Sequence, residues 1–316
     1  MFIPSEEIAR IIKNEPVQLF NLLYRVSIGE DILDDECYYE ILRLRNNIKN
    51  KYLKSVEMVT ILQDVFSSGF AYKFVKLLEE HELLEKVFPS IDNLIKVDGG
   101  HYHNETVYTH VLGALRALDK NKKIPWFVKL AALYHDCGKN TWEFSDEGKK
   151  RFLNHAQKGG PIVEKDLKAL GFDDTVVDYV KTIVMMHMQQ IDGPHSIRKL
   201  DRIYREHDVD PKYFFWVRYA DNKGSAVYKT DFSYYWELYR KFKKTLYVKK
   251  EPSVKDLDID GHILMKHFHK KPGKWLGMLL SYLFVGVQER GYINEQEALL
   301  KEAEKFMEWY KGDKND

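Results

Sequence analysis

Histidine and aspartate residues recur through the middle third of this 316-residue chain, and most of them follow an apolar helical run. Asp221 ends the run FFWVRYAD, and Asp136 closes the run VKLAALYHD. A carboxylate at the end of an apolar helix is costly to bury without a partner, and a divalent cation would satisfy both. Neutral imidazoles are the usual nitrogen ligands beside such carboxylates. The candidate metal ligands are His110, His135, Asp136, His155, His187 and Asp221.

The adjacent pair His135–Asp136 is the most specific part of this pattern, because it begins the segment HDCGK. Neighbouring His and Asp side chains can straddle a cation, and Lys139, one turn after His135, could point at a bound phosphate. No group beside Cys137 suggests an activated thiolate, so this residue is predicted to fill the core. A single histidine on an apolar helix face is more often a hydrogen-bonded core residue, so spacing alone leaves both interpretations open.

Helices are the elements that must position these residues. Gly and Pro together number only 27, which favours long helices with few tight turns. Alternating strand patterns are scarce, so the sequence predicts an all-α fold in which distant helices project ligands into a bundle centre. Asp34 or Asp35, and Ser55, are predicted helix caps. Helices are expected at 16–27, from 34 or 35 to about 47, and at 56–67, 70–80, 105–119, 126–137, 154–170, 174–188, 211–224, 230–247, 273–289 and 295–311.

Charge is balanced overall but unevenly distributed. Lys and Arg number 49 against 48 Asp and Glu, which excludes a global basic field. Residues 229–274, however, carry 12 Lys and Arg against 6 Asp and Glu, with aromatic residues interleaved. Such a segment is either a solvated helix face or a contact surface for an RNA backbone. The candidate RNA contacts are Lys243, Lys244, Lys270 and Lys271.

The cysteine content and the apolar segments indicate the cellular compartment. Two cysteines, Cys37 and Cys137, exclude a disulfide scaffold and fit a reducing environment. Charged residues interrupt the N-terminal segment, which therefore does not read as a signal peptide. The longest apolar stretch, at about 276–287, is too short to span a bilayer. A cytoplasmic protein that does not enter the membrane is expected, and the sequence leaves its oligomeric state open.

The order H…HD…H…H…D, with HDCGK at its centre, resembles the HD-domain metal-dependent phosphohydrolases. The flanks HNETVYTH, RFLNHAQKGGPIVEKDLKALGF and RYADNKGSA resemble the HD region of bacterial tRNA nucleotidyltransferases, the CCA-adding enzymes. The upstream stretch AYKFVKLLEEHELLEKVFPSIDNL and the segment beginning DLDIDGHILMKHFHKK are also similar to those enzymes. The similarity extends over about residues 15–305. It implies an HD bundle flanked by neck-like and tail-like helices.

Residue by residue, the resemblance implies a centre with two divalent cations, drawn from Mn, Ni, Co, Fe, Zn or Mg. Asp136 would bridge the two cations, and Asp136 and Lys139 are the residues expected to carry catalysis. Lys139 would offset phosphate charge, and Lys158 and Arg218 are weaker phosphate-binding candidates whose alternative is an ordinary surface charge. The first cation would be held by His110, His135, Asp136 and Asp221, and the second by Asp136, His155 and His187.

Departures from the family's pattern decide which activity is expected. The family's neck motif D-P-x-R-x-x-R corresponds to residues 15–21, where Gln18 and Asn21 replace both arginines. A second neck motif, E-R-x-x-x-E, keeps Glu57 but has Met58 and Leu62 at its other two polar positions. Only 14 residues precede the neck-like region, so the nucleotidyltransferase head is expected to be absent. CCA addition is therefore not expected.

The expected domains are a neck-like region at 1–98, an HD phosphohydrolase domain at 99–228 and a body/tail-like region at 229–316. The expected activity is hydrolysis of 2′,3′-cyclic phosphates, 2′-nucleotides or phosphomonoesters, with a nucleotide or an RNA 3′ end as substrate and tRNA as a candidate partner. The alternatives are a nucleotidase for free nucleotides, a non-catalytic RNA-binding module with structural metals, and a subunit that complements a separate head. Five other histidines are expected in loops or in contact with solvent or RNA: His101, His103, His262, His267 and His269.

Overall fold

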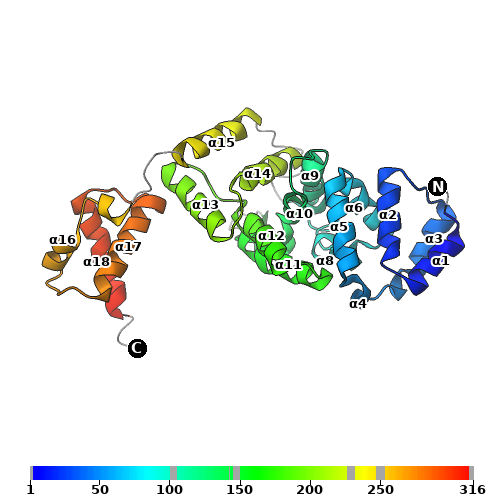
Figure 1. Cartoon of the computed structure of the whole chain (residues 1–316), viewed down its shortest axis with the longest axis horizontal. Coiled ribbons are helices and arrows are strands. Elements are labelled where there is room, and N and C mark those ends of the chain that lie inside the picture. The colour runs from blue at the N-terminus through cyan, green and yellow to red at the C-terminus, as the bar shows by residue number, and fades with distance from the viewer. Residues whose placement is uncertain are drawn as a thin grey trace. The chain divides into compact units, whose positions relative to one another are not determined.

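The computed structural model describes residues 3–99, 105–141, 143–144, 150–225, 232–246 and 253–312, and it confirms the all-α fold (Figure 1). Within these residues the strands are limited to a short antiparallel hairpin. Its strands β1 (Glu143–Phe144) and β2 (Lys150–Arg151) pair Glu143 with Arg151. The described helices include none that is both long and apolar enough to cross a bilayer.

Short helices with predictable caps form the N-terminal part. The Asp34 side chain accepts a hydrogen bond from the backbone N–H of Cys37 at 2.8 Å, and Ser55 accepts one from Met58 at 3.1 Å. Both residues therefore cap helices as the sequence predicts. The elements are α1 (Ser5–Asn14), α2 (Gln18–Ile28), α3 (Asp35–Leu44), η1 (Arg45–Asn47), α4 (Asn50–Leu53), α5 (Val56–Ser68), α6 (Ala71–Glu80), α7 (Leu84–Val87) and α8 (Pro89–Asp92).

The central helices end earlier than apolar periodicity predicts. Helix α10 ends at Tyr134 and α12 at Met186, so the residues that follow each of them lie at a helix terminus. A terminus lets the backbone turn and aim successive side chains in different directions, which a continuous helix cannot do. The elements are α9 (Val107–Asp119), α10 (Trp126–Tyr134), η2 (Cys137–Asn140), α11 (His155–Leu170), α12 (Asp174–Met186) and α14 (Lys212–Gly224).

Residues beyond this part include α13 (Pro194–Glu206), a helix that the sequence-based prediction did not contain. Arg198 of α13 donates to Gln288, and Arg202 pairs with Glu289 at 2.7 Å. Both acceptors lie on α17, and these polar contacts add to the apolar face that α13 buries with Ile197, Leu200 and Tyr204. The other elements are α15 (Phe232–Leu246), η3 (Val254–Asp256), α16 (Gly261–His267), α17 (Lys274–Glu289) and α18 (Gln296–Gly312).

Packing divides the chain into two compact units. The first unit comprises Met1–Met188 with His207–Tyr235, and the second comprises Gln189–Glu206 with Trp236–Asp316. The second unit has its own apolar core, built around Leu279, Leu283 and Leu299. The sequence-based division at 1–98, 99–228 and 229–316 stays a prediction.

The first unit joins the N-terminal helices to α9 and α10 through a shared core. The rings of Phe66, Phe88 and Tyr134 pack edge to face in series, with centroids 6.3 and 6.1 Å apart. The buried Asp119 carboxylate accepts the backbone N–H groups of Ala71 and Tyr72 at 3.1 and 3.0 Å, and so caps α6. These contacts join the N-terminal helices to α9 and α10 in one core.

Candidate metal centre

Two glycines bring α9 and α14 into backbone contact. A Cβ atom on Gly224 would lie 2.5 Å from the backbone nitrogen of Ala114 and 2.8 Å from the carbonyl oxygen of His110. On the facing helix, a Cβ on Gly113 would lie 2.8 Å from the carbonyl oxygen of Gly224. Such distances exclude any side chain, so only glycine permits this approach. The approach sets His110 of α9 opposite Asp221 of α14.

A first cluster of ligand atoms forms at this helix crossing. The Nε2 atom of His110 lies 3.2 Å from Oδ1 of Asp221 and 3.1 Å from Nε2 of His135. His135 follows directly on the end of α10. One ligand atom from each of the three side chains lies within 4.8 Å of the others, a spacing that could hold a metal ion.

A second cluster forms between α11 and α12, which also pack through glycines. A Cβ on Gly160 would lie 2.6 Å from the Met185 sulfur, and one on Gly159 would lie 3.0 Å from Val184. This packing sets His155, at the start of α11, beside His187, just after α12, with 3.2 Å between their Nε2 atoms. Together with Asp136, these two histidines form the second group of ligand atoms within 4.8 Å of one another.

Asp136 connects the two clusters by dividing its carboxylate oxygens between them. Its Oδ2 atom lies 3.5 Å from Nε2 of His110 and 3.4 Å from Nε2 of His135. Its Oδ1 atom lies 3.2 Å from Nε2 of His155 and 3.7 Å from Nε2 of His187. Two donors about 2.1 Å from one tetrahedral cation lie roughly 3.4 Å apart, so these separations suit ligands that share a cation.

Gly138 allows the backbone to come close enough to α11 for Asp136 to reach both clusters. A Cβ on Gly138 would lie 2.0 Å from the carbonyl oxygen of His155, so η2 can approach the start of α11 only with glycine at this position. Asp136 precedes η2 by one residue and is therefore carried to the second cluster. The Cys137 side chain is buried and donates weakly to the Gly159 carbonyl at 3.6 Å, in agreement with its predicted role as a core residue.

Backbone carbonyl groups orient three of the imidazole rings. Nδ1 of His135 donates to the Ala132 carbonyl at 2.8 Å, and in His155 and His187 the Nδ1 atoms donate to the carbonyls of Phe152 and Val184. Each acceptor lies three residues before its histidine. A ring whose Nδ1 carries the proton has a lone pair on Nε2, the atom that faces the cluster in all three cases. The orientations of these rings, and the tautomer that each adopts when neutral, therefore fit a metal ion.

The electrostatics of the cluster are those of a buried and strongly coupled group. Burial opposes protonation of His135, but the carboxylates of Asp136 and Asp221 outweigh it and raise the pKa of His135 to about 10. Burial, reinforced by the positive charge of His135, lowers the pKa of His187 to about 3. Burial would raise the pKa of Asp136, but Lys139 and His135 outweigh it and hold that pKa well below its usual range. Burial would also raise the pKa of Asp221, but hydrogen bonds from His110 and His135 hold it well below its usual range, so both carboxylates are available as anionic ligands.

Cationic side chains lie at the edges of the centre. Lys139 Nζ is 2.7 Å from Oδ2 of Asp136, and Arg218 Nη1 is 3.5 Å from Oδ2 of Asp221. Lys158, the third phosphate-binding candidate, is exposed, and its Nζ lies 3.5 Å from the Thr141 hydroxyl. Lys139 and Arg218 thus contact the bridging carboxylate and a terminal one, whereas Lys158 contacts a hydroxyl outside the two clusters.

The structure does not place the other predicted residues in this centre. His267 pairs with Glu304 at 3.0 Å, and Lys243 and Lys270 lie over the rings of Tyr239 and Trp275. The remaining candidates in this part, His262, His269, Lys244 and Lys271, also belong to the second unit. His101 and His103 lie outside the described residues. Sequence reasoning missed the roles of the glycines at positions 113, 138, 159, 160 and 224, for which glycine inside a helical pattern was the available signal.

Comparison with known proteins agrees with this architecture. Residues 107–222 match the family model of the HD domain, and residues 217–303 match a family described as tRNA nucleotidyltransferase domain 2. The HD-domain match covers all six candidate ligands. The resemblance to the HD region and the following part of a tRNA nucleotidyltransferase is therefore confirmed.

A curated relative shows the same relationship along more of the chain. The CC-adding tRNA nucleotidyltransferase of Thermus thermophilus is 28% identical over 242 residues, which is 75% of this chain. The chain spans about half of that relative, since the match covers 52% of its length. The similarity thus extends well beyond the residues that match the HD domain.

Proposed function

We propose that this chain is a metal-dependent phosphohydrolase of the 2′,3′-cyclic phosphodiesterase, 2′-nucleotidase or phosphatase type. The observation that carries the proposal is the position of Asp136, whose two carboxylate oxygens face separate groups of histidines. A purely structural metal site commonly surrounds one ion with four protein ligands. Two adjacent groups that share a carboxylate suit a pair of ions that act together on a phosphoryl group.

Six side chains would hold the cations, as the donor set suggests. His110, His135 and Asp221 would bind the first, His155 and His187 the second, and Asp136 both. When bound, such cations polarise a phosphoryl group and lower the pKa of a water molecule to near neutrality. Mixed nitrogen and oxygen donors favour Mn, Fe, Co, Ni or Zn over an all-oxygen Mg site, and Mg remains an option with few protein ligands.

Lys139 and Arg218 would act on the substrate directly. In the structure Lys139 pairs with Oδ2 of Asp136, the oxygen that also faces His110 and His135, and Arg218 pairs with the outer Oδ2 atom of Asp221. With cations on the carboxylates, these two side chains would be available to pair with phosphate oxygens. Fixed positive charge at developing negative charge stabilises a phosphoryl-transfer transition state.

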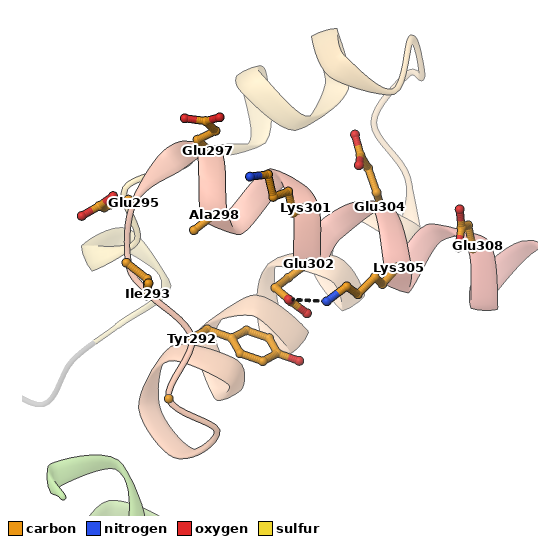
Figure 2. Close-up of a pocket in the computed structure, with 11 residues that line it drawn as sticks. Tyr292, Ile293, Glu295, Glu297, Ala298, Lys301, Glu302, Glu304, Lys305 and Glu308 are labelled. Carbon is orange, nitrogen blue, oxygen red and sulfur yellow. Dashed lines mark hydrogen bonds and ion pairs between the residues drawn. The ribbon is translucent and has the colours of Figure 1, made fainter.

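An RNA 3′ end or a nucleotide is the proposed substrate, with tRNA as a candidate RNA partner. The name of the curated relative concerns tRNA, and residues 217–303 match a tRNA nucleotidyltransferase domain. We infer that RNA contacts include Lys243, Lys244, Lys270 and Lys271. The opposite charge dominates a hollow of about 720 Å³ beside α18, where Glu297, Glu304 and Glu308 are among the acidic residues that outnumber the lysines (Figure 2). A phosphate backbone would avoid that hollow.

Nucleotide addition is not proposed for this chain. The neck-like positions at which the family has arginines hold Gln18 and Asn21. In the structure Asn21 Nδ2 donates to Gln18 Oε1 at 3.2 Å, and Gln18 in turn donates to Glu57. Neutral amides that bond to one another replace two fixed charges, which removes the bidentate donors of a guanidinium. The cytoplasmic location expected from the sequence also stays a prediction.

The test is hydrolysis of 2′,3′-cAMP, 2′-AMP and p-nitrophenyl phosphate by the purified chain, with each candidate metal in turn. Turnover is expected with at least one metal, and Asp136→Ala should reduce it by at least about a thousandfold because both clusters lose a ligand. His262→Ala, a histidine change in the second unit, is the matched control and should keep full activity. Activity that survives Asp136→Ala would contradict the metal assignment.

The alternatives predict different outcomes in the same experiments. A nucleotidase for free nucleotides would have a higher kcat/KM for 2′-AMP than for an RNA oligonucleotide with a 2′,3′-cyclic phosphate end. A binding module with structural metals would retain RNA in a salt-dependent manner and turn over no substrate with any metal. A subunit that serves a separate nucleotidyltransferase head would co-purify with that head.

A further inference from the structure

A buried carboxylate lies behind the metal centre without contacting it. Asp166, on α11, is 3% exposed, and its Oδ2 atom accepts two hydrogen bonds from other elements. The backbone N–H of Ser90 in α8 donates at 3.2 Å, and the hydroxyl of Tyr134 in α10 donates at 3.3 Å. A buried carboxylate is costly, and burial raises the pKa of Asp166. Hydrogen bonds from two separate elements offset part of that cost.

Asp166 lies where elements that carry candidate ligands of both clusters meet. Tyr134 is the last residue of α10, directly before the pair His135–Asp136. Asp166 lies on the helix that begins with His155. Helix α8, whose Ser90 donates to Asp166, packs against both α11 and η2, the short helix after Asp136. The carboxylate thus lies at a junction of the elements that must stay in register for Asp136 to reach His155.

We propose that Asp166 is a positioning residue for the metal centre, which it serves by tying Tyr134 of α10 and Ser90 of α8 to α11. Through Tyr134 it fixes the end of α10, and with it the direction of the Asp136 carboxylate. Residues that orient metal ligands from outside the coordination sphere typically contribute a factor of about 10–100 to metal affinity. The inference rests on the proposed metal centre and concerns the affinity of that centre.

Variants of Asp166 separate positioning from simple packing. Asp166→Leu keeps the branching at Cγ but has no acceptor, so the Ser90 N–H and the Tyr134 hydroxyl lose their partner. Its affinity for Co²⁺, measured by titration calorimetry and by the Co²⁺ absorption bands, is expected to fall about 10–100-fold. Asp166→Asn keeps an acceptor oxygen and is expected to bind Co²⁺ within about threefold of the wild type. Rescue by this conservative variant would show that the acceptor, rather than the charge, is required.

Asp119 offers a matched control. It is also buried, also accepts two hydrogen bonds from another element, and its pKa is likewise raised by burial. Asp119 caps α6, away from the clusters. Asp119→Leu is therefore expected to lower the urea midpoint without changing Co²⁺ affinity or the Co²⁺ spectrum.

Tyr134→Phe keeps the test informative if Asp166→Leu fails to fold. This change removes only the hydroxyl, and it should weaken Co²⁺ binding in the same direction. Where Asp166→Leu folds, combining it with Tyr134→Phe should show non-additive effects, because Tyr134 acts through Asp166. Wild-type Co²⁺ affinity in folded Asp166→Leu or Tyr134→Phe would overturn the inference. A wild-type chain that binds no Co²⁺ would instead overturn the proposed metal centre.

Discussion

The backbone of Gly113 meets that of Gly224 so closely that a Cβ atom on Gly113 would lie 2.8 Å from the Gly224 carbonyl oxygen. Gly224→Ala would force α9 and α14 apart and separate His110 from Asp221. Overpacking of this kind destabilises proteins by about 1–3 kcal/mol, and backbone neighbours cannot move aside as side chains can. Urea unfolding should report the loss of stability, and calorimetry should report weakened metal binding by the first cluster.

A second glycine provides the control for that substitution. Gly277 lies inside α17, and a Cβ there would meet nothing within 4 Å. Gly277→Ala should therefore stabilise its helix by about 0.5–1 kcal/mol and leave metal binding unchanged. If Gly224→Ala and Gly277→Ala lowered the free energy of unfolding equally, the close contact between α9 and α14 would not be the cause of the destabilisation.

Metal stoichiometry should resolve the two clusters. His110→Ala removes a ligand of the first cluster only, and His155→Ala removes one of the second only. Each variant should retain about one Mn²⁺ or Co²⁺ per chain against two in the wild type, because the other group keeps all of its three or four proposed ligands. Mass spectrometry of the metal content after gel filtration measures this. Simultaneous loss of both ions from either variant would contradict two separable clusters.

Stability should depend on pH through Glu164, which ties α11 to α12. Its carboxylate pairs with Lys181 at 2.6 Å and with Lys168 at 2.9 Å. Hydrogen bonds from these lysines lower the pKa of Glu164 from 4.5 to about 2 in the folded chain. The unfolded chain therefore binds the proton first as pH falls, so this stabilisation is complete above pH 4.5 and is lost between there and pH 2.

Glu164→Gln should flatten that part of the stability profile. The variant should have a lower urea midpoint than the wild type at pH 7, and the difference should shrink between pH 4.5 and pH 2. Glu85→Gln, on the separate helix α7, is a control of the same chemistry. If the urea midpoint of the wild type stays above that of Glu164→Gln by a constant amount down to pH 2, Glu164 is not the group whose protonation lowers stability.

RNA binding, if it uses the basic residues of the second unit, should lose salt dependence when they are neutralised. Each phosphate contact contributes about 0.7 to the slope of log affinity against log salt for single strands. Replacing Lys243, Lys244, Lys270 and Lys271 by Gln should reduce the slope by up to about 3. The control replaces Lys120, Lys122 and Lys123, exposed lysines of the first unit, and should leave it unchanged. Filter binding across a salt series measures both.

Most of the candidate ligands could be picked out from the sequence because they leave a local mark. Carboxylates such as Asp221 follow apolar runs, and the pair His135–Asp136 is adjacent in sequence. The caps at Asp34 and Ser55 were predictable for the same reason, since a cap bonds to the residue three positions later. Local chemistry of this kind is present in any short window of the chain.

Other features depend on how distant segments meet. Nothing near Asp136 in sequence indicates that Oδ1 faces His155 and Oδ2 faces His135, or that Lys139 bonds to Asp136 in the folded chain. Helix α13 was not predicted because most of its residues are polar or charged, although Ile197, Leu200 and Tyr204 form a buried apolar face at helical spacing. Asp166 resembles a surface residue in sequence, and only the approach of Ser90 and Tyr134 shows that it is buried.

The two clusters differ in how far apart their ligands lie along the chain. His155 and His187 are separated by 32 residues, whereas His110 and Asp221 are separated by 111. Closing a longer loop costs more conformational entropy and slows the formation of its contacts. During synthesis on the ribosome, all three candidate ligands of the second cluster are made before Asp221. The first cluster is completed last, so a chain truncated before α14 would still contain the second group of candidate ligands, Asp136, His155 and His187.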